Sequence, residues 1–178
     1  MKIFVIRHGE VDVNIYEGIN GRNTSSLTEK GIKQANEAIK DVRALPIDLI
    51  ICSPLKRTIE TCKIINTLDI PVIYDERILE RDAKSMMYKV TATVDLNVFY
   101  DPDAMVIFKD CEGFGSIVER VKSFLEDIKK NYYDKNILIV THNDVCKAIR
   151  CVINNNYDIN EIINFNQNNC EILEYELK

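Results

Sequence analysis

The chain has 178 residues, of which 46% are hydrophobic and 29% charged, and its formal net charge is −5. This length suits one domain with a sizeable core, so we expect a single domain over residues 1–178. The acidic balance argues against a nucleic-acid or membrane surface, although a few arginines in a cleft can still bind a small anion. The N-terminal apolar run is too short for a signal peptide, and no stretch has the length of a transmembrane helix. These features predict a cytoplasmic protein.

Short apolar runs, taken in chain order, predict the strands. Four of them predict buried strands, at Ile3 to Ile6, Leu49 to Cys52, Pro71 to Tyr74 and Ile137 to Val140. The partly alternating tail from Glu171 to Leu177 predicts an edge strand. Residues 83 to 110 show no clear periodicity, so we expect them to form an excursion over the end of the sheet.

Amphipathic patterns between these runs predict helices. The first covers Gly31 to Val42 with Thr28 as its N-cap, and the second begins with Ser53 as N-cap and Pro54 at the first helical position. A capping box at Ser116–Glu119 predicts the third, and Asn143 or Asp144 is expected to cap the fourth. Strands that alternate with helices predict a three-layer α/β/α sandwich around a mostly parallel sheet.

The chain contains only two histidines, and each directly follows a predicted strand. His8 stands in Arg7-His8-Gly9, and His142 stands in Thr141-His142-Asn143. In open α/β sheets, ligands bind beyond the carboxyl ends of the strands. We therefore expect the two imidazoles to belong to one site.

The residues around His8 suit phosphoryl chemistry. A neutral imidazole is a good nucleophile toward phosphorus, and the planar donors of Arg7 fit phosphate oxygens. Gly9 would allow the backbone to approach a ligand closely. Arg57 stands in the first turn of the helix after Ser53-Pro54, where an anion is also favoured.

Two further residue classes leave alternatives open. The charged run from Asp75 to Asp82 can supply a general acid, but periodicity does not choose among Glu76, Glu80 and Asp82. The six cysteines include no Cys-x-x-Cys pair and no zinc spacing, so buried reduced thiols are favoured over a nucleophilic Cys52.

Taken in order, these motifs resemble those of the histidine phosphatase superfamily, also called the phosphoglycerate mutase-like family. The resemblance covers nearly the whole chain. Its motifs are Arg7-His8-Gly9-Glu10 with Asn14, Asn20-Gly21 before Leu27-Thr28-Glu29-Lys30-Gly31, Ser53-Pro54-Leu55-Lys56-Arg57-Thr58 with Thr61, Glu76 to Glu80, Glu112 with Arg120, and Thr141-His142 with Val145.

The resemblance implies a role for each matched residue. His8 would be the nucleophile that becomes phosphorylated, and Glu80 would protonate the leaving oxygen and then activate water. The transferred group would be bound by Arg7, Asn14, Arg57 and His142. No metal and no cofactor would be required, and the partner would be a small phosphorylated substrate, with a homodimer left open.

The chain departs from the family pattern at three places. Asn143 and Asp144 stand where two glycines commonly follow the histidine, which adds side chains and one negative charge near the phosphate pocket. Lys84 stands where the acid loop commonly has a glycine, so a different backbone is expected there. Gly113 stands where the family commonly has a serine.

Several functions share this set of residues. A mutase would need extra segments to cover the site, so the short chain favours a phosphatase acting on a small phosphomonoester, such as a sugar phosphate or α-ribazole phosphate. A cofactor-dependent phosphoglycerate mutase and a catalytically weak protein that senses phosphate-bearing ligands are the alternatives. A nucleotide-binding module is disfavoured, because Gly113-Phe114-Gly115-Ser116 lacks a third glycine.

Overall fold

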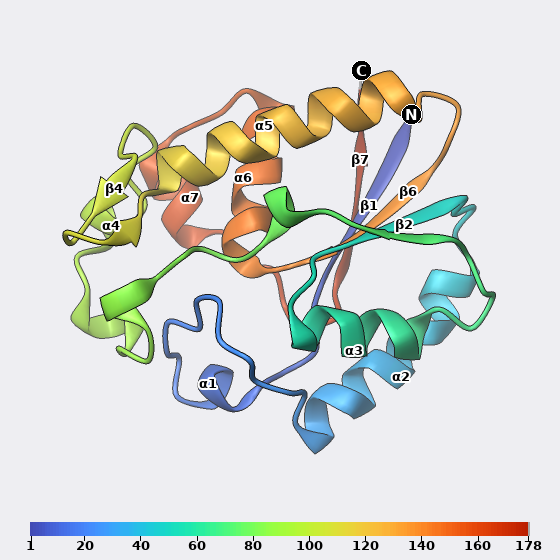
Figure 1. Cartoon of the computed structure of the whole chain (residues 1–178), viewed down its shortest axis with the longest axis horizontal. Coiled ribbons are helices and arrows are strands. Elements are labelled where there is room, and N and C mark those ends of the chain that lie inside the picture. The colour runs from blue at the N-terminus through green and yellow to red at the C-terminus, as the bar shows by residue number, and fades with distance from the viewer. Residues whose placement is uncertain (178) are drawn as a thin grey trace.

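The computed structural model describes residues 1–177 and is built around a five-stranded sheet with the strand order β3-β2-β6-β1-β7 (Figure 1). β7 pairs antiparallel with β1, and the other pairs are parallel. The predicted mostly parallel sheet and its edge strand are thus confirmed. The strands are β1 (Lys2–Arg7), β2 (Leu49–Cys52), β3 (Val72–Tyr74), β6 (Ile137–Thr141) and β7 (Ile172–Glu176).

Helices cover both faces of the sheet. Ile3 and Val5 of β1 pack on one face with α5 (Phe114–Asn131) and α6 (Asn143–Asn154). Phe4 and Ile6 of the same strand pack on the other face with α2 and α3. The predicted three-layer sandwich is therefore confirmed, because successive side chains of a strand point to opposite faces. The helices of the second face are α2 (Glu29–Arg43) and α3 (Lys56–Ile65).

The segment between β3 and α5 forms the predicted excursion beside the end of the sheet. It contains α4 (Leu96–Phe99) and a small antiparallel hairpin of β4 (Val106–Ile107) and β5 (Cys111–Glu112). The remaining short elements are α1 (Asp12–Ile15), α7 (Ile159–Asn164) and the 3₁₀ turns Glu76–Ile78, Lys84–Met86 and Thr91–Thr93. No helix within residues 1–177 is long and apolar enough to cross a membrane.

Three of the predicted helix starts are wrong, and tertiary contacts give the reason. α3 begins at Lys56, because the Ser53 hydroxyl pairs with His142 instead of capping the helix. α5 begins at Phe114, and Ser116 lies inside it with its hydroxyl donating to the Glu112 carboxylate. The N-cap of α6 is His142 itself.

The fourth predicted helix start is confirmed, and one predicted strand is more exposed than expected. Thr28 caps α2 as predicted, since its hydroxyl accepts a hydrogen bond from the Gly31 N–H at 3.0 Å. β3 was predicted to be buried, but Ile73 and Tyr74 are 37% and 54% exposed. The reason is that β3 lies at the edge of the sheet.

The carboxyl ends of the central strands meet at one edge of the sheet. Arg7 of β1 pairs with Thr141 of β6, and Cys52 of β2 pairs with Val140. The ladder continues one residue further, because the N–H groups of His8 and Ser53 donate to the carbonyls of Thr141 and Val140, each at 3.0 Å. The predicted motifs therefore converge at this edge.

Candidate active site

A cavity of about 480 Å³ opens at this edge of the sheet, and the six predicted site residues gather in and beneath it. Its lining includes Arg7, His8, Asn14 and Glu80. Arg57 and His142 are fully buried below the lining: the Arg57 Nε lies 3.2 Å from the His8 Nε2, and the rings of His8 and His142 are 5.3 Å apart. The volume suits a small-molecule site.

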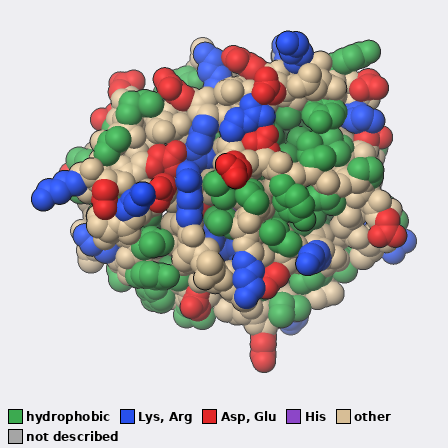
Figure 2. All heavy atoms as spheres, in the orientation of Figure 1, with side chains coloured by type: hydrophobic (Ala, Val, Ile, Leu, Met, Phe, Trp, Pro, Cys, Tyr) green, Lys and Arg blue, Asp and Glu red, His purple; other side chains and the backbone are tan. Residues whose placement is uncertain are grey.

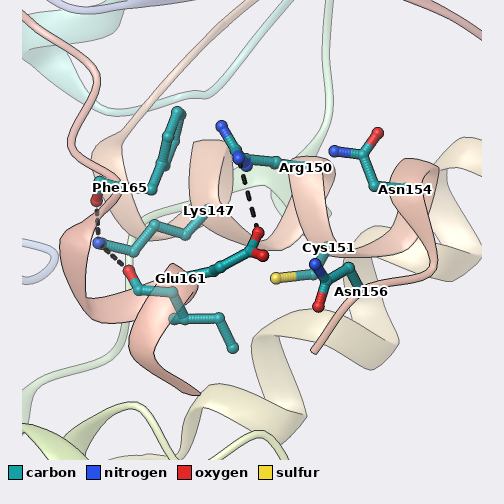
Figure 3. Close-up of a pocket in the computed structure, with 8 residues that line it drawn as sticks. Lys147, Arg150, Cys151, Asn154, Asn156, Glu161 and Phe165 are labelled. Atoms are coloured by element: carbon teal, nitrogen blue, oxygen red, sulfur yellow. Dashed lines mark hydrogen bonds and ion pairs between the residues drawn. The ribbon is translucent and has the colours of Figure 1, made fainter. Parts of the chain in front are cut away.

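A second cavity, between α6 and α7, has a volume of about 10 Å³ (Figure 3). That volume holds little more than one water molecule, so it offers no room for a substrate.

The hydrogen bonds of His8 define which ring nitrogen is free to react. Nδ1 lies 2.7 Å from the Gly9 carbonyl oxygen, which requires the proton to be on Nδ1. Nε2 then carries a lone pair and accepts from the Arg57 Nε. Burial, followed by the nearby charges of Arg57 and Arg7, holds the pKa of His8 well below its usual value. The imidazole is therefore neutral at neutral pH, with the lone pair on Nε2.

Arg57 is a fully buried cation and Arg7 a partly buried one, and neither has a carboxylate partner within residues 1–177. Neither forms an ion pair within residues 1–177, and the Arg7 Nε has no hydrogen-bond partner there. Arg57 is held by the carbonyls of Gly21 and Asn23, and burial lowers its pKa only to about 10, so it stays charged. Buried charges are normally paired, so this pair of arginines indicates a site for an anion.

His142 is held from behind by Ser53. The Ser53 Oγ lies 2.8 Å from the His142 Nε2, whereas the His142 Nδ1 is buried without a partner in the described chain. If the hydroxyl donates to Nε2, the proton of the neutral ring is on Nδ1 and is available to a ligand. Burial, followed by the charge of Arg57, lowers the pKa of His142 well below its usual value.

Among the acidic residues of the run 75–82, the structure brings Glu80 alone to the cavity. Its side chain is buried, and its Oε1 accepts from the Arg81 N–H at 3.0 Å. Burial, followed by the charge of Asp144 and opposed by that of Arg57, raises the pKa of Glu80 to about 7. Asp82 instead points to Lys84, 3.4 Å away. A carboxyl group with a pKa near neutrality suits a general acid and base.

A partly buried ionic network holds the backbone of the acid loop. The Arg22 Nε donates to the Glu80 carbonyl at 2.9 Å, and the Glu112 carboxylate accepts from the Asp82 N–H at 2.9 Å. Arg120 pairs with Glu112 at 2.8 Å and donates to the Arg77 carbonyl. The Glu112 and Arg120 spacing in the sequence thus serves to position Glu80.

Asn14 lies at the cavity with its amide oxygen accepting from the Val11 N–H at 3.1 Å. This bond directs the amide nitrogen away from the backbone, where it can serve a ligand.

The prediction that Gly9 lets the backbone approach a ligand is wrong, because the close approach of Gly9 is to another part of the protein. A Cβ on Gly9 would lie 2.6 Å from the Gly31 carbonyl oxygen, so the glycine lets the loop pack on the start of α2.

Several residues in and next to the cavity wall were not predicted from the sequence. Asn169 of the wall donates to the His8 carbonyl at 2.8 Å, and Gln167, next to the wall, accepts a hydrogen bond from Arg7 through its carbonyl at 2.7 Å. Arg81, Tyr100 and Lys147 also line the cavity. The polar run from Asn166 to Asn169 was the one signal that could have drawn attention to this wall.

The residues that depart from the family pattern lie partly in the cavity wall and partly in loops near it. Asn143 and Asp144 do line the cavity, as their place after His142 suggests. Lys84 has a φ of +45°, which lies in the region that favours glycine. The lysine therefore adopts a backbone conformation that a glycine at this position would also adopt, so replacing the glycine does not require a different loop backbone. The nearby Gly113 would place a Cβ 2.0 Å from the Ala104 carbonyl oxygen, so that glycine serves packing.

The face of the molecule in Figure 2 carries basic and acidic side chains close together, and no histidine is visible on it. Residues 1–177 contain no group of three or more His, Cys, Asp or Glu side chains arranged to hold a metal ion.

Comparison with known proteins places this geometry in a family. The model of the histidine phosphatase superfamily (branch 1) matches residues 3–178. Phosphoserine phosphatase 1 of Hydrogenobacter thermophilus is 28% identical, over 86% of this chain and 76% of its own. The adenosylcobalamin/alpha-ribazole phosphatase of Escherichia coli is 26% identical, over 84% of this chain and 77% of its own.

A solved structure extends the likeness to the fold. The phosphoserine phosphatase of Entamoeba histolytica, in complex with 3-phosphoglyceric acid, has a TM-score of 0.84 and 26% identity, with 97% of this chain and 89% of its own covered. The cytoplasmic location and a homodimer stay predictions. The predicted enzyme class, a phosphatase, is confirmed, and the chain belongs to the histidine phosphatase superfamily (branch 1).

Proposed function

We propose that this chain is a metal-independent phosphatase that hydrolyses a small phosphomonoester through a phosphohistidine on His8. The observation that carries the proposal is the unprotonated Nε2 of His8 beside two arginines, Arg57 buried and Arg7 partly buried, that have no carboxylate partner within residues 1–177. The arginines supply the positive charge that a phosphoryl group requires. The cavity in front of His8 has room for the rest of a small ester.

In the first step, the His8 Nε2 attacks phosphorus and the bond from phosphorus to the ester oxygen breaks. Glu80, protonated in part at neutral pH, donates its proton to the departing oxygen, which leaves as an alcohol. Arg7, Arg57, Asn14 and the Nδ1 of His142 bind the phosphoryl oxygens and stabilise the charge of the transition state.

In the second step, the Glu80 carboxylate takes a proton from water while the water oxygen attacks phosphorus. The bond from phosphorus to Nε2 breaks, inorganic phosphate leaves, and His8 and Glu80 return to their starting protonation states. Their pKa values suit these roles, since His8 is neutral and Glu80 can both lose and regain its proton near pH 7.

Turnover of p-nitrophenyl phosphate in excess chelator tests the proposal, with wild type compared to His8→Ala. We expect activity that survives the chelator and falls by at least about 10³-fold in the variant. When the phosphate of the substrate carries ³²P, a protein-bound label that is stable to alkali and lost in acid should appear on wild type and not on the variant. Turnover that needs a metal, or that persists without His8, would contradict the mechanism.

An assay for isomerisation separates the mutase alternative. The protein is given 2-phosphoglycerate and catalytic 2,3-bisphosphoglycerate, and the release of inorganic phosphate is compared with the formation of 3-phosphoglycerate. We expect any turnover to release phosphate. Isomerisation that outpaces hydrolysis would overturn the assignment as a phosphatase.

A further inference from the structure

The cavity wall beyond the phosphoryl site carries no surplus charge. Apart from Arg7 and the proposed acid Glu80, four charged side chains line the cavity within residues 1–177: Glu17, Arg81, Asp144 and Lys147. Two of them are cations and two are carboxylates, so their charges cancel. Which substrate the wall accepts therefore depends on whether either cation is free to bind an anion.

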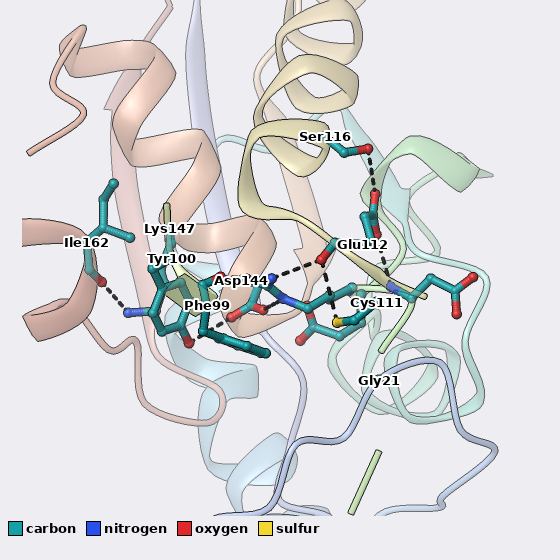
Figure 4. A network of polar contacts seen from close by, with 12 residues as sticks. Gly21, Phe99, Tyr100, Cys111, Glu112, Ser116, Asp144, Lys147 and Ile162 are labelled. Carbon is teal, nitrogen blue, oxygen red and sulfur yellow. Dashed lines mark hydrogen bonds and ion pairs between the residues drawn. The ribbon is translucent and has the colours of Figure 1, made fainter. Parts of the chain in front are cut away.

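Arg81 is neutralised by a buried partner. Its Nε donates to the Asp144 Oδ2 at 2.7 Å, and the other oxygen of Asp144 accepts from the Tyr100 hydroxyl at 3.2 Å (Figure 4). The Nη1 of Arg81 donates to the carbonyls of Phe99 and Glu112, each at 3.0 Å, and the guanidinium lies 3.8 Å from the centroid of the Phe99 ring. Arg81 is thus fixed in one position, with its charge compensated.

One nitrogen of Arg81 remains available as a donor. The side chain is 1% exposed and lines the cavity, and its Nη2 has no hydrogen-bond partner among the described residues. An unpaired buried donor is costly, and a ligand atom in the cavity would satisfy it. This nitrogen offers a hydrogen bond without net charge.

The ammonium group of Lys147 is already occupied. It donates to the carbonyls of Ile162, Ile163 and Phe165 at the end of α7. Figure 3 shows the bond from Lys147 to Phe165. An ammonium group has three N–H donors, and these three carbonyls use them all. Lys147 is 3% exposed, so it cannot turn to a substrate without losing these bonds.

The remaining wall is rich in amides. Its asparagines can both donate and accept, and two of them have a buried polar atom without a partner in the described chain, the Nδ2 of Asn20 and the Oδ1 of Asn143. Hydroxyl groups also both donate and accept, whereas a carboxylate only accepts. The asparagines of the wall are Asn14, Asn20, Asn143, Asn166, Asn168 and Asn169.

We propose that the substrate is the phosphate ester of an uncharged polyol, a sugar or sugar alcohol, and that Asp144 excludes substrates with a carboxylate. The Nη2 of Arg81 and the cavity amides bind the hydroxyl groups. A substrate carboxylate would be desolvated beside the Arg81–Asp144 pair, and no described residue of the cavity wall outside the phosphoryl site offers an unpaired cation to receive it. This inference rests on the proposed phosphatase function and names the substrate class of the same site.

Two esters that differ in one group test the substrate class on wild type. Glycerol 3-phosphate and 3-phosphoglycerate share the carbon chain and the position of the phosphate, and differ in a CH₂OH group against a carboxylate. We expect kcat/KM to be at least about tenfold higher for glycerol 3-phosphate, since the carboxylate of 3-phosphoglycerate would lose its water beside an ion pair that is already neutral. Equal rates, or a preference for 3-phosphoglycerate, would overturn the inference.

The variant Asp144→Asn tests the residue, with Asp82→Asn as the matched control, because Asp82 pairs with Lys84 outside the cavity. Asp144→Asn should lower the preference for glycerol 3-phosphate by about tenfold, chiefly through a gain on 3-phosphoglycerate, while Asp82→Asn leaves the ratio unchanged. A folded Asp144→Asn protein, checked by circular dichroism, with an unchanged ratio would overturn the role of Asp144. If this variant does not fold, the wild-type ratio still decides the substrate class.

The two proposals fail in different ways. Wild type that turns over p-nitrophenyl phosphate but prefers 3-phosphoglycerate contradicts the substrate class alone. Wild type that turns over none of the three esters contradicts the phosphatase function itself.

Discussion

The floor of the cavity is formed by the ends of parallel strands, whereas its wall is formed by segments that enter from distant parts of the chain. The floor contains Arg7, His8 and His142, each at or directly after the last residue of β1 or β6. The wall brings Tyr100 against Asp144 and Lys147 of α6. The two regions also differ in charge, because the cations of the floor are unpaired in the described residues and Arg81 of the wall is paired.

This difference separates chemistry from specificity. In the proposed mechanism, the floor supplies the nucleophile and the cationic binding site for the phosphoryl group, which any phosphomonoester would present. The wall meets the part of the substrate that differs from one ester to another. We therefore expect changes in the floor to reduce turnover of all esters, and changes in the wall to alter the ranking of esters.

The largest effect is expected for Arg57→Lys in the floor. The guanidinium of Arg57 reaches His8, Gly21 and Asn23 at once, and an ammonium group cannot keep that planar arrangement. We expect kcat/KM to fall by about 10²- to 10³-fold for every ester. Arg77→Lys is the control, because Arg77 pairs with Asp75 and Asp127 outside the cavity. A loss confined to some esters would contradict the role of Arg57 as a general phosphoryl ligand.

The next effect separates leaving groups. Glu80→Gln removes the proposed proton donor, so kcat/KM for an alkyl phosphate should fall by about 10²-fold, whereas p-nitrophenyl phosphate, whose leaving group needs little protonation, should lose less. Asp82→Asn should change neither rate by more than about twofold, as expected for a surface substitution. If Asp82→Asn slows the alkyl ester and Glu80→Gln does not, the acid has been misassigned.

A coupling between wall and floor should appear in the pH profile. Glu80 must be protonated to donate, so kcat/KM for an alkyl ester should fall as pH rises through about 7. Asp144 raises the pKa of Glu80, while Arg57 and Arg81 lower it. Asp144→Asn should therefore move the fall in kcat/KM to lower pH. The same ester is used for both proteins, so that ionisation of the substrate cancels. If the fall in kcat/KM moves to higher pH or stays at the same pH, Glu80 does not control it.

The smallest effect is expected for a change at Ser53, which holds His142 from behind the floor of the cavity. Ser53→Ala removes the hydroxyl that holds the His142 Nε2, and should lower kcat/KM by about three- to tenfold for all esters while leaving their ranking unchanged. Ser25→Ala, whose hydroxyl pairs with Asp12 at an exposed position, is the matched control. A change in ranking would show that His142 contacts more than the phosphoryl group.

Local sequence was sufficient to predict the sheet and the floor. A run such as Ile3 to Ile6 identifies a buried strand by its own composition, and parallel strands place their carboxyl ends at one edge. Helix starts were predicted less well. Ser53 has the sequence of an N-cap, but its hydroxyl is 2.8 Å from a histidine 89 residues away, a contact that no local pattern reveals.

The sequence by itself determined the family, the three-layer fold and five of the residues that the structure brings together, because each of the five lies in a short motif tied to the end of a strand or the start of a helix. These five are Arg7, His8, Asn14, Arg57 and His142. The tertiary structure alone decided which carboxyl group of the run 75–82 enters the cavity, and that Arg81 is neutralised by Asp144. The physical reason is that burial and ion pairing depend on contacts between distant segments, here 63 residues apart for Arg81 and Asp144. Those contacts set both the pKa of Glu80 and the charge that a substrate meets.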